Sequence, residues 1–126
     1  FMVNEKCKNV LGPGTHATTF GGNPICCAGA ISTVERLDED LLKGVKERSQ
    51  LIFDTLSGKP GIKSVTGLGL MLGIETQKPV GEVIAACRER GVLVLSAKNK
   101  LRLLPPLNIP MPLLMEAVHL IMEALL

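Results

Sequence analysis

The sequence predicts an α+β fold in which helices cover one face of a mostly antiparallel sheet of three to four short strands. Two patterns lead to this class. Amphipathic segments with a helical period occur at residues 41–56, 79–90 and 113–126. Short apolar or alternating segments, bounded by Gly, Pro or Asn, occur at residues 62–66, 70–75, 92–95 and 101–104. The 126 residues, 46% of them hydrophobic, are enough for one folded core.

The first 22 residues predict a short helical end followed by a loop, because the glycines at 12, 14, 21 and 22 interrupt any helix. Asn23 and Pro24 form a strong helix start, since Asn caps free N–H groups and Pro at the first helical position loses no hydrogen bond. The helix that follows is rich in small residues at 26–30 and continues through Leu37. The acidic residues 38–40 either cap this helix or start the next one.

The next helix carries an apolar stripe and ends at the Gly and Pro residues of segment 58–61. The stripe consists of Leu41, Leu42, Val45, Ser49, Ile52, Phe53 and Leu56. Residues 62–66 and 70–75 then predict a β-hairpin, with a turn or bulge at residues 67–69.

A third helix, residues 79–90, is predicted to end at Gly91 and to lead into a strand at 92–95. A turn at Asn99 and Lys100 precedes a strand at 101–104, which the two prolines at 105 and 106 end. The closing helix is expected to be buried through Leu114, Val118, Ile121, Met122 and Leu125.

The composition excludes several classes of partner. A net charge of +2 with scattered basic residues and 2% aromatic residues gives no basis for binding nucleic acid or an anionic membrane. No apolar stretch approaches the roughly 20 residues of a membrane span, and charged residues stand where a signal peptide would be apolar. We therefore expect a cytoplasmic protein, and a chain cut from a longer one.

The four cysteines lack the spacing of a zinc site or a disulfide framework. We expect no metal, and we expect all four to be reduced thiols packed in the core or between helices.

Two features carry a chemical signal. Thr18 and Thr19 place two hydroxyls beside glycines and an Asn-capped helix start, which together with free backbone N–H groups would form an anion site. The alternative is that these residues only form a loop. Arg102 lies between apolar residues in a short strand, so its guanidinium either reaches solvent or meets an anion, and its planar fork suits a carboxylate.

Three segments together resemble the class III pyridoxal-phosphate-dependent aminotransferases. Residues 16–24, His-Ala-Thr-Thr-Phe-Gly-Gly-Asn-Pro, resemble the family segment H-G-[ST]-T-[FY]-G-G-N-P. Residues 67–75 resemble G-x-G-L-M-x-G-[IV], and residues 101–109 resemble L-R-[LF]-x-P-P-L-x-[IV]. The order and spacing agree over essentially the whole chain, which implies the small C-terminal domain of a fold-type I aminotransferase.

The resemblance implies three parts and three site residues. The parts are residues 1–22, a phosphate-loop segment from the large domain and dimer interface; residues 23–57, the bridging helices; and residues 58–126, the small C-terminal α/β domain. Thr19 would bind the phosphate of the pyridoxal 5'-phosphate held by the neighbouring subunit of a homodimer. Thr18 would lie beside the substrate, and Arg102 would pair with the substrate α-carboxylate.

The resemblance also implies a reaction, the transfer of an amino group from a small amino acid to 2-oxoglutarate. The sequence is most similar to members that use N-acetylornithine in arginine biosynthesis, and members that use ornithine, succinylornithine or 4-aminobutyrate are the alternatives. The family's cofactor-holding lysine lies upstream of residue 16, and no lysine of this chain occupies its motif. We therefore expect no catalytic residue here, and an isolated chain that is inactive and binds no cofactor.

Two departures from the family pattern stand out. Ala17 replaces the usual Gly, and Thr66 stands where relatives often carry Arg. Two other functions compete with the transaminase: a free-standing, non-catalytic α+β binding module, and an interaction domain in which the small-residue helix at 26–30 packs on a partner. Without the rest of the enzyme, we expect the loop before Asn23 and the helix after it to be disordered, rearranged or part of a non-native oligomer.

Overall fold

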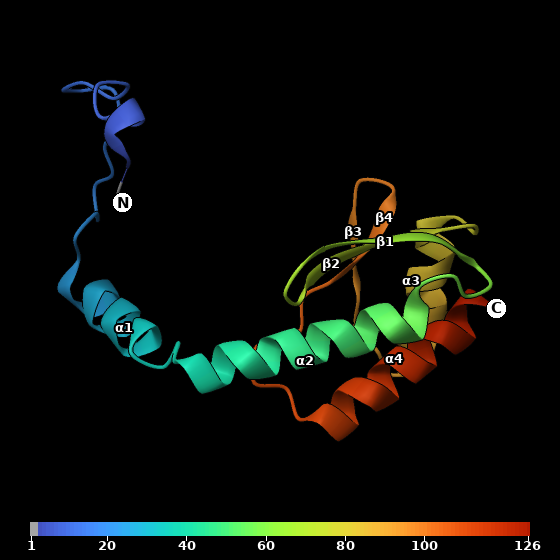
Figure 1. Cartoon of the computed structure of the whole chain (residues 1–126). Coiled ribbons are helices and arrows are strands. Elements are labelled where there is room, and N and C mark those ends of the chain that lie inside the picture. The colour runs from blue at the N-terminus through green and yellow to red at the C-terminus, as the bar shows by residue number, and fades with distance from the viewer. Residues whose placement is uncertain (1–2) are drawn as a thin grey trace. The chain divides into compact units, whose positions relative to one another are not determined.

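The computed structural model describes residues 3–126, and the chain divides into two compact units, Phe1–Leu37 and Asp38–Leu126. Figure 1 labels the helices and strands of both units. The first unit contains η1 (Glu5–Cys7) and α1 (Pro24–Val34). The second contains α2 (Glu39–Leu56), β1 (Ile62–Leu68), β2 (Met71–Thr76), α3 (Val80–Glu89), β3 (Leu95–Ala97), β4 (Lys100–Leu103) and α4 (Met111–Leu125).

The first unit has no core of its own among its described residues. Asn23 and Ser32 are half-buried, and every other residue from 3 to 37 is exposed. α1 begins at Pro24 as predicted but ends at Val34, short of Leu37. The reason lies in Asp38, whose carboxylate accepts the Leu41 N–H at 2.8 Å and so caps α2. The acidic segment therefore starts the second helix.

The second unit contains a four-stranded antiparallel sheet in the order β1-β2-β4-β3. The predicted hairpin of β1 and β2 is confirmed, but its turn lies at Gly69 and Leu70. Gly67 belongs to the strand ladder and not to the turn. Its φ is +141°, and a Cβ there would lie 2.2 Å from the carbonyl oxygen of Met71, so only glycine fits.

The predicted strand at 92–95 is wrong in its start, because β3 begins only at Leu95. The end of α3 explains the delay. Gly91, at φ +83°, donates its N–H to the Arg88 carbonyl at 3.0 Å, and Val92 donates its N–H to the Cys87 carbonyl at 2.9 Å. This pair of bonds is a Schellman cap, so Val92 completes the helix end and does not enter the sheet.

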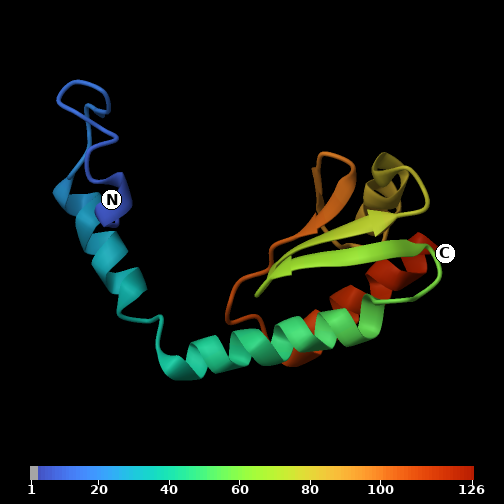
Figure 2. The same ribbon diagram turned by 45° about the horizontal axis from the view of Figure 1, so that its top comes forward.

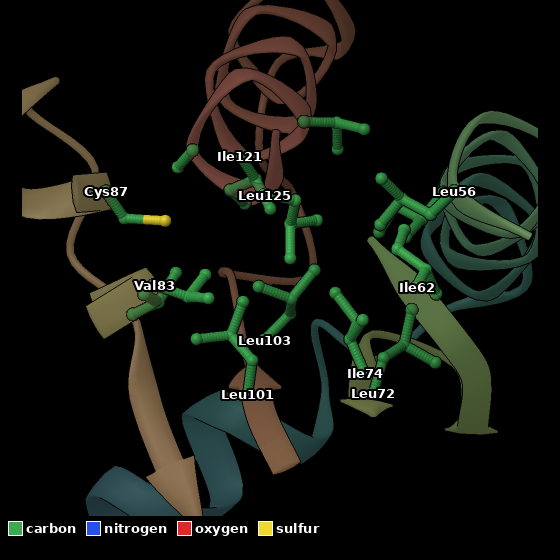
Figure 3. Close-up of a cluster of buried hydrophobic side chains, with 14 of the residues drawn as sticks. Leu56, Ile62, Leu72, Ile74, Val83, Cys87, Leu101, Leu103, Ile121 and Leu125 are labelled. Atoms are coloured by element: carbon green, nitrogen blue, oxygen red, sulfur yellow. The ribbon is translucent and has the colours of Figure 1, made fainter. Parts of the chain in front are cut away.

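Helices α2, α3 and α4 cover one face of the sheet and leave the other open (Figure 2). The buried side chains lie between these helices and the sheet (Figure 3). The predicted stripes supply this core, with Val45, Ile52 and Leu56 from α2 buried. The prediction that Leu42 belongs to this buried stripe is wrong, because its side chain is 47% exposed at the edge of the stripe. In α4, Leu114, Val118, Ile121 and Leu125 are buried as predicted, whereas Met122 is half-buried.

The α+β class is thus confirmed. The cysteine prediction is only partly correct, since Cys87 is buried in the core but Cys7, Cys26 and Cys27 are exposed thiols. Burial raises the pKa of the Cys87 thiol, and the nearby positive charge of Arg90 opposes this shift. No helix within residues 3–126 combines the length and the apolar character needed to cross a bilayer.

Candidate functional site

The loop that carries Thr18 and Thr19 turns twice before α1. The Gly21 N–H donates to the Thr18 carbonyl at 3.3 Å, and the Asn23 N–H donates to the Phe20 carbonyl at 3.2 Å. A Cβ on Gly21 would lie 2.5 Å from the methyl carbon of Thr18, so the Thr18 side chain occupies the space that glycine leaves free. Gly21 therefore leaves the room in which the Thr18 methyl group packs.

The start of α1 limits which donors this loop can offer to an anion. The Asn23 side-chain oxygen accepts the N–H groups of Ile25 at 2.9 Å and Cys26 at 3.3 Å. Asn23 thus caps the helix start as predicted, and these two donors are already used within the chain. The exposed hydroxyls of Thr18 and Thr19 are available to an anion beside the positive end of the α1 dipole. Two hydroxyl donors with close glycine packing are compatible with a phosphate group.

Arg102 lies on the open face of the sheet, opposite the helices. Its neighbours along β4, Leu101 and Leu103, are buried on the helix-covered face, so the alternation of the strand directs Arg102 outward. Within residues 3–126, the Arg102 guanidinium forms neither a hydrogen bond nor an ion pair with the protein. Its donors are therefore available to an external anion.

One row of residues crosses the open face through Arg102. The strand registers pair Leu95 with Arg102, Arg102 with Gly73, and Gly73 with Thr66. Gly73 has no side chain, and the Lys100 side chain occupies the space above it, with Cδ 3.2 Å from where a Cβ would lie. The Lys100 ammonium then donates to the Thr66 hydroxyl at 3.0 Å.

Arg102 also borders an apolar cleft of about 330 Å³ between the sheet end and α4. Arg102 is the one charged residue among those that line this cleft, which include Leu95, Leu104 and Ile109. The cleft lies on the helix-covered side, whereas the Arg102 side chain starts from the open face.

The predicted site residues belong to different units of the chain. Thr18 and Thr19 lie in the first unit and Arg102 lies in the second. Sequence reasoning missed Lys100 and Gly73. A signal was available for Lys100, because residues two apart on a strand share a face, which places Lys100 beside Arg102. The contact with Thr66 depends on the strand order and had no local signal.

A family model for class-III aminotransferases matches residues 1–125. Acetylornithine aminotransferase from Haemophilus ducreyi is 40% identical over 86% of this chain, which corresponds to 28% of that protein. The chain thus spans less than a third of the length of this relative. Class III aminotransferases use pyridoxal phosphate as their cofactor.

Two solved structures are similar to the chain. An ornithine aminotransferase from Toxoplasma gondii, which has pyridoxal phosphate partly occupying its active site, matches with a TM-score of 0.76 at 32% identity. The match covers 92% of this chain and 30% of that one. An acetylornithine aminotransferase from Elizabethkingia anophelis matches with a TM-score of 0.75 at 29% identity, over 92% of this chain and 33% of that one.

Proposed function

The chain belongs to the class-III aminotransferases, and we propose that it forms the C-terminal part of a homodimeric enzyme that transfers the amino group of N-acetylornithine to 2-oxoglutarate. The observation that carries this proposal is the Arg102 guanidinium, which is exposed on the open face of the sheet and forms no hydrogen bond or ion pair within residues 3–126. An arginine already paired with a carboxylate of the chain would have fewer donors left for a substrate.

Arg102 holds the substrate through its α-carboxylate. The planar guanidinium donates two parallel hydrogen bonds to the two carboxylate oxygens, which fixes both the position and the rotation of the substrate. Orientation of this kind contributes to the rate by removing the freedom of the reacting molecule before the chemical step.

Thr19 anchors the phosphate of the cofactor bound to the other subunit, and Thr18 contacts the substrate. Pyridoxal phosphate, when bound, supplies the electron sink for the bonds at the amino-acid α-carbon. To the cofactor phosphate this segment contributes hydroxyl donors, because Asn23 already accepts the Ile25 and Cys26 N–H groups at the start of α1. Without the lysine that holds the cofactor covalently, this chain alone is inactive.

The exposed apolar surface of the first unit supports the proposal that more protein surrounds it. Phe20 is 79% exposed and Ile25 is 82% exposed, and no residue between 3 and 37 is buried. A surface of this kind is typical of a segment that packs on a partner. In the complete enzyme, residues 1–22 pack as a phosphate-loop segment at the dimer interface, residues 23–57 as bridging helices, and residues 58–126 as the small domain.

The choice of amino donor rests on sequence identity. Curated relatives from Haemophilus ducreyi and Lactococcus lactis are acetylornithine aminotransferases at 40% and 41% identity. These names favour N-acetylornithine over ornithine, succinylornithine and 4-aminobutyrate, and with it a role in arginine biosynthesis.

The test is a donor panel on the complete protein loaded with pyridoxal phosphate. Each of the four donors is supplied with 2-oxoglutarate, and glutamate formation is measured. We expect the highest kcat/KM for N-acetylornithine. A higher value for another donor would reassign the substrate, and no glutamate from any donor would reject the transaminase.

A further inference from the structure

A second cation lies beside Arg102 on the open face of the sheet. Lys100 and Arg102 occupy alternate positions of β4, so both side chains start from the same face, roughly 7 Å apart along the strand. The Lys100 ammonium is held in place by the Thr66 hydroxyl on β1, two strands away, at 3.0 Å.

Gly73 makes this long reach possible. It lies on β2, between Lys100 and Thr66, and the position of a Cβ on Gly73 would be 3.2 Å from Cδ of Lys100. The lysine side chain therefore passes directly over the glycine backbone. Thr66 in turn donates its hydroxyl proton to the Gly73 carbonyl at 3.3 Å, which orients its oxygen as an acceptor for Lys100.

No carboxylate of the described chain neutralises either cation. Glu75 stands opposite Lys100 in the strand register, yet its carboxylate accepts a hydrogen bond from Ser64 at 3.2 Å. None of the ion pairs found within residues 3–126 includes Lys100 or Arg102. Two unpaired cations on one side of a strand repel each other, and an anion placed near both relieves the repulsion.

We propose that Lys100 is a positioning residue that attracts the substrate carboxylate toward Arg102, with its side chain passing over Gly73 and its ammonium held by Thr66 on the same face of the sheet. This inference rests on the proposed function of Arg102. The ligand that Lys100 attracts is a small carboxylate. Lys100 should raise the affinity for a dicarboxylate such as 2-oxoglutarate the most. Because the attraction acts through space, it weakens as salt screens the charges.

The test measures the dissociation constant of succinate, an unreactive dicarboxylate, for the complete cofactor-loaded protein at low and high salt. The variants are Lys100→Gln, Lys100→Arg, Arg102→Gln and the control Lys78→Gln, an exposed lysine that lies outside the open-face row. Lys100→Gln should weaken succinate binding about three- to tenfold at low salt and much less at high salt. Lys100→Arg should restore binding, and Lys78→Gln should match the wild type.

Steady-state kinetics on the same variants give a second readout. Lys100→Gln should raise the KM for 2-oxoglutarate by a factor similar to the loss of succinate affinity, with a much smaller change in kcat. Equal succinate affinities for Lys100→Gln and Lys78→Gln would overturn the inference, provided that Arg102→Gln weakens binding. If Arg102→Gln also leaves succinate binding unchanged, the proposed function of Arg102 is what fails.

Discussion

Gly73 stands directly opposite Arg102 in the ladder between β2 and β4, so the guanidinium has no side chain facing it from the central strand. On its other side, Arg102 faces Leu95, which is 63% exposed. The space over this glycine is taken by the Lys100 side chain, so a carboxylate that approaches Arg102 from the side of β2 passes next to Lys100. The pairing of Arg102 with Gly73 and Leu95 therefore determines which side chains surround the guanidinium in the candidate site.

Arg102→Lys tests whether the planar fork matters and not only the positive charge. In the complete enzyme we expect kcat/KM for the amino donor to fall at least about tenfold, because an ammonium cannot form two parallel bonds to a carboxylate. The free energy of unfolding should change by no more than about 0.5 kcal/mol, since the side chain is exposed. A variant with wild-type kinetics would remove Arg102 from substrate binding.

Thr19→Val tests the phosphate anchor. The substitution keeps the shape of the side chain and removes the hydroxyl, so the cofactor should dissociate from the complete enzyme about tenfold more readily. Fluorescence titration with pyridoxal phosphate measures this change. Thr18→Val is the matched control, and it should mainly raise the KM of the substrate. Equal cofactor affinity in Thr19→Val and wild type would contradict the assignment.

Gly67→Ala should destabilise the second unit by more than about 2 kcal/mol. The added Cβ would lie 2.2 Å from a backbone carbonyl oxygen, and the φ of +141° is unfavourable for any side chain. Urea unfolding monitored by circular dichroism measures the change. Gly81→Ala is the control, because its Cβ would meet nothing within 4 Å in the first turn of α3. That variant should be more stable by about 0.5 kcal/mol. Similar effects of the two substitutions would contradict the described hairpin.

Cys87 should make the stability of the second unit fall at alkaline pH. Its pKa in the folded state is raised above the ordinary value of 9.0 by burial, so the stability is fully present below pH 9.0 and is lost as the pH rises through the folded pKa. Unfolding free energies between pH 7 and 10 should decline more steeply for the wild type than for Cys87→Ala. Parallel declines would show that the thiol does not contribute.

The same burial separates Cys87 from the other thiols in reactivity. Cys7, Cys26 and Cys27 are exposed in the chain, so they should react with a thiol reagent in the native state. Cys87 should react only after denaturation. Four rapidly reacting thiols in the native chain would contradict the buried position of Cys87.

Local chemistry was enough to predict the elements whose ends are set within a few residues. Asn23 caps α1 and Gly91 ends α3, and each of these features depends on side chains or φ values next to the helix end. The open-face position of Arg102 follows from simple alternation along β4.

Elements whose limits depend on distant partners were less predictable. The turn of the first hairpin lies at Gly69 and not at Gly67, because both glycines allow a turn and only the strand register selects between them. Likewise, the Lys100–Thr66 hydrogen bond joins residues 34 positions apart across β2. Nothing in the local sequence of either residue indicates this contact.

The central claim is that this chain acts as one part of a transaminase whose cofactor-holding lysine lies on another part. The most direct measurement is the nucleotide sequence that precedes the codon of Phe1. We expect an open reading frame that continues upstream and encodes an aspartate motif followed by a lysine in a Ser/Thr-rich loop. A start codon immediately before Phe1 would contradict the role as one part of a transaminase and would make the chain a free-standing binding module.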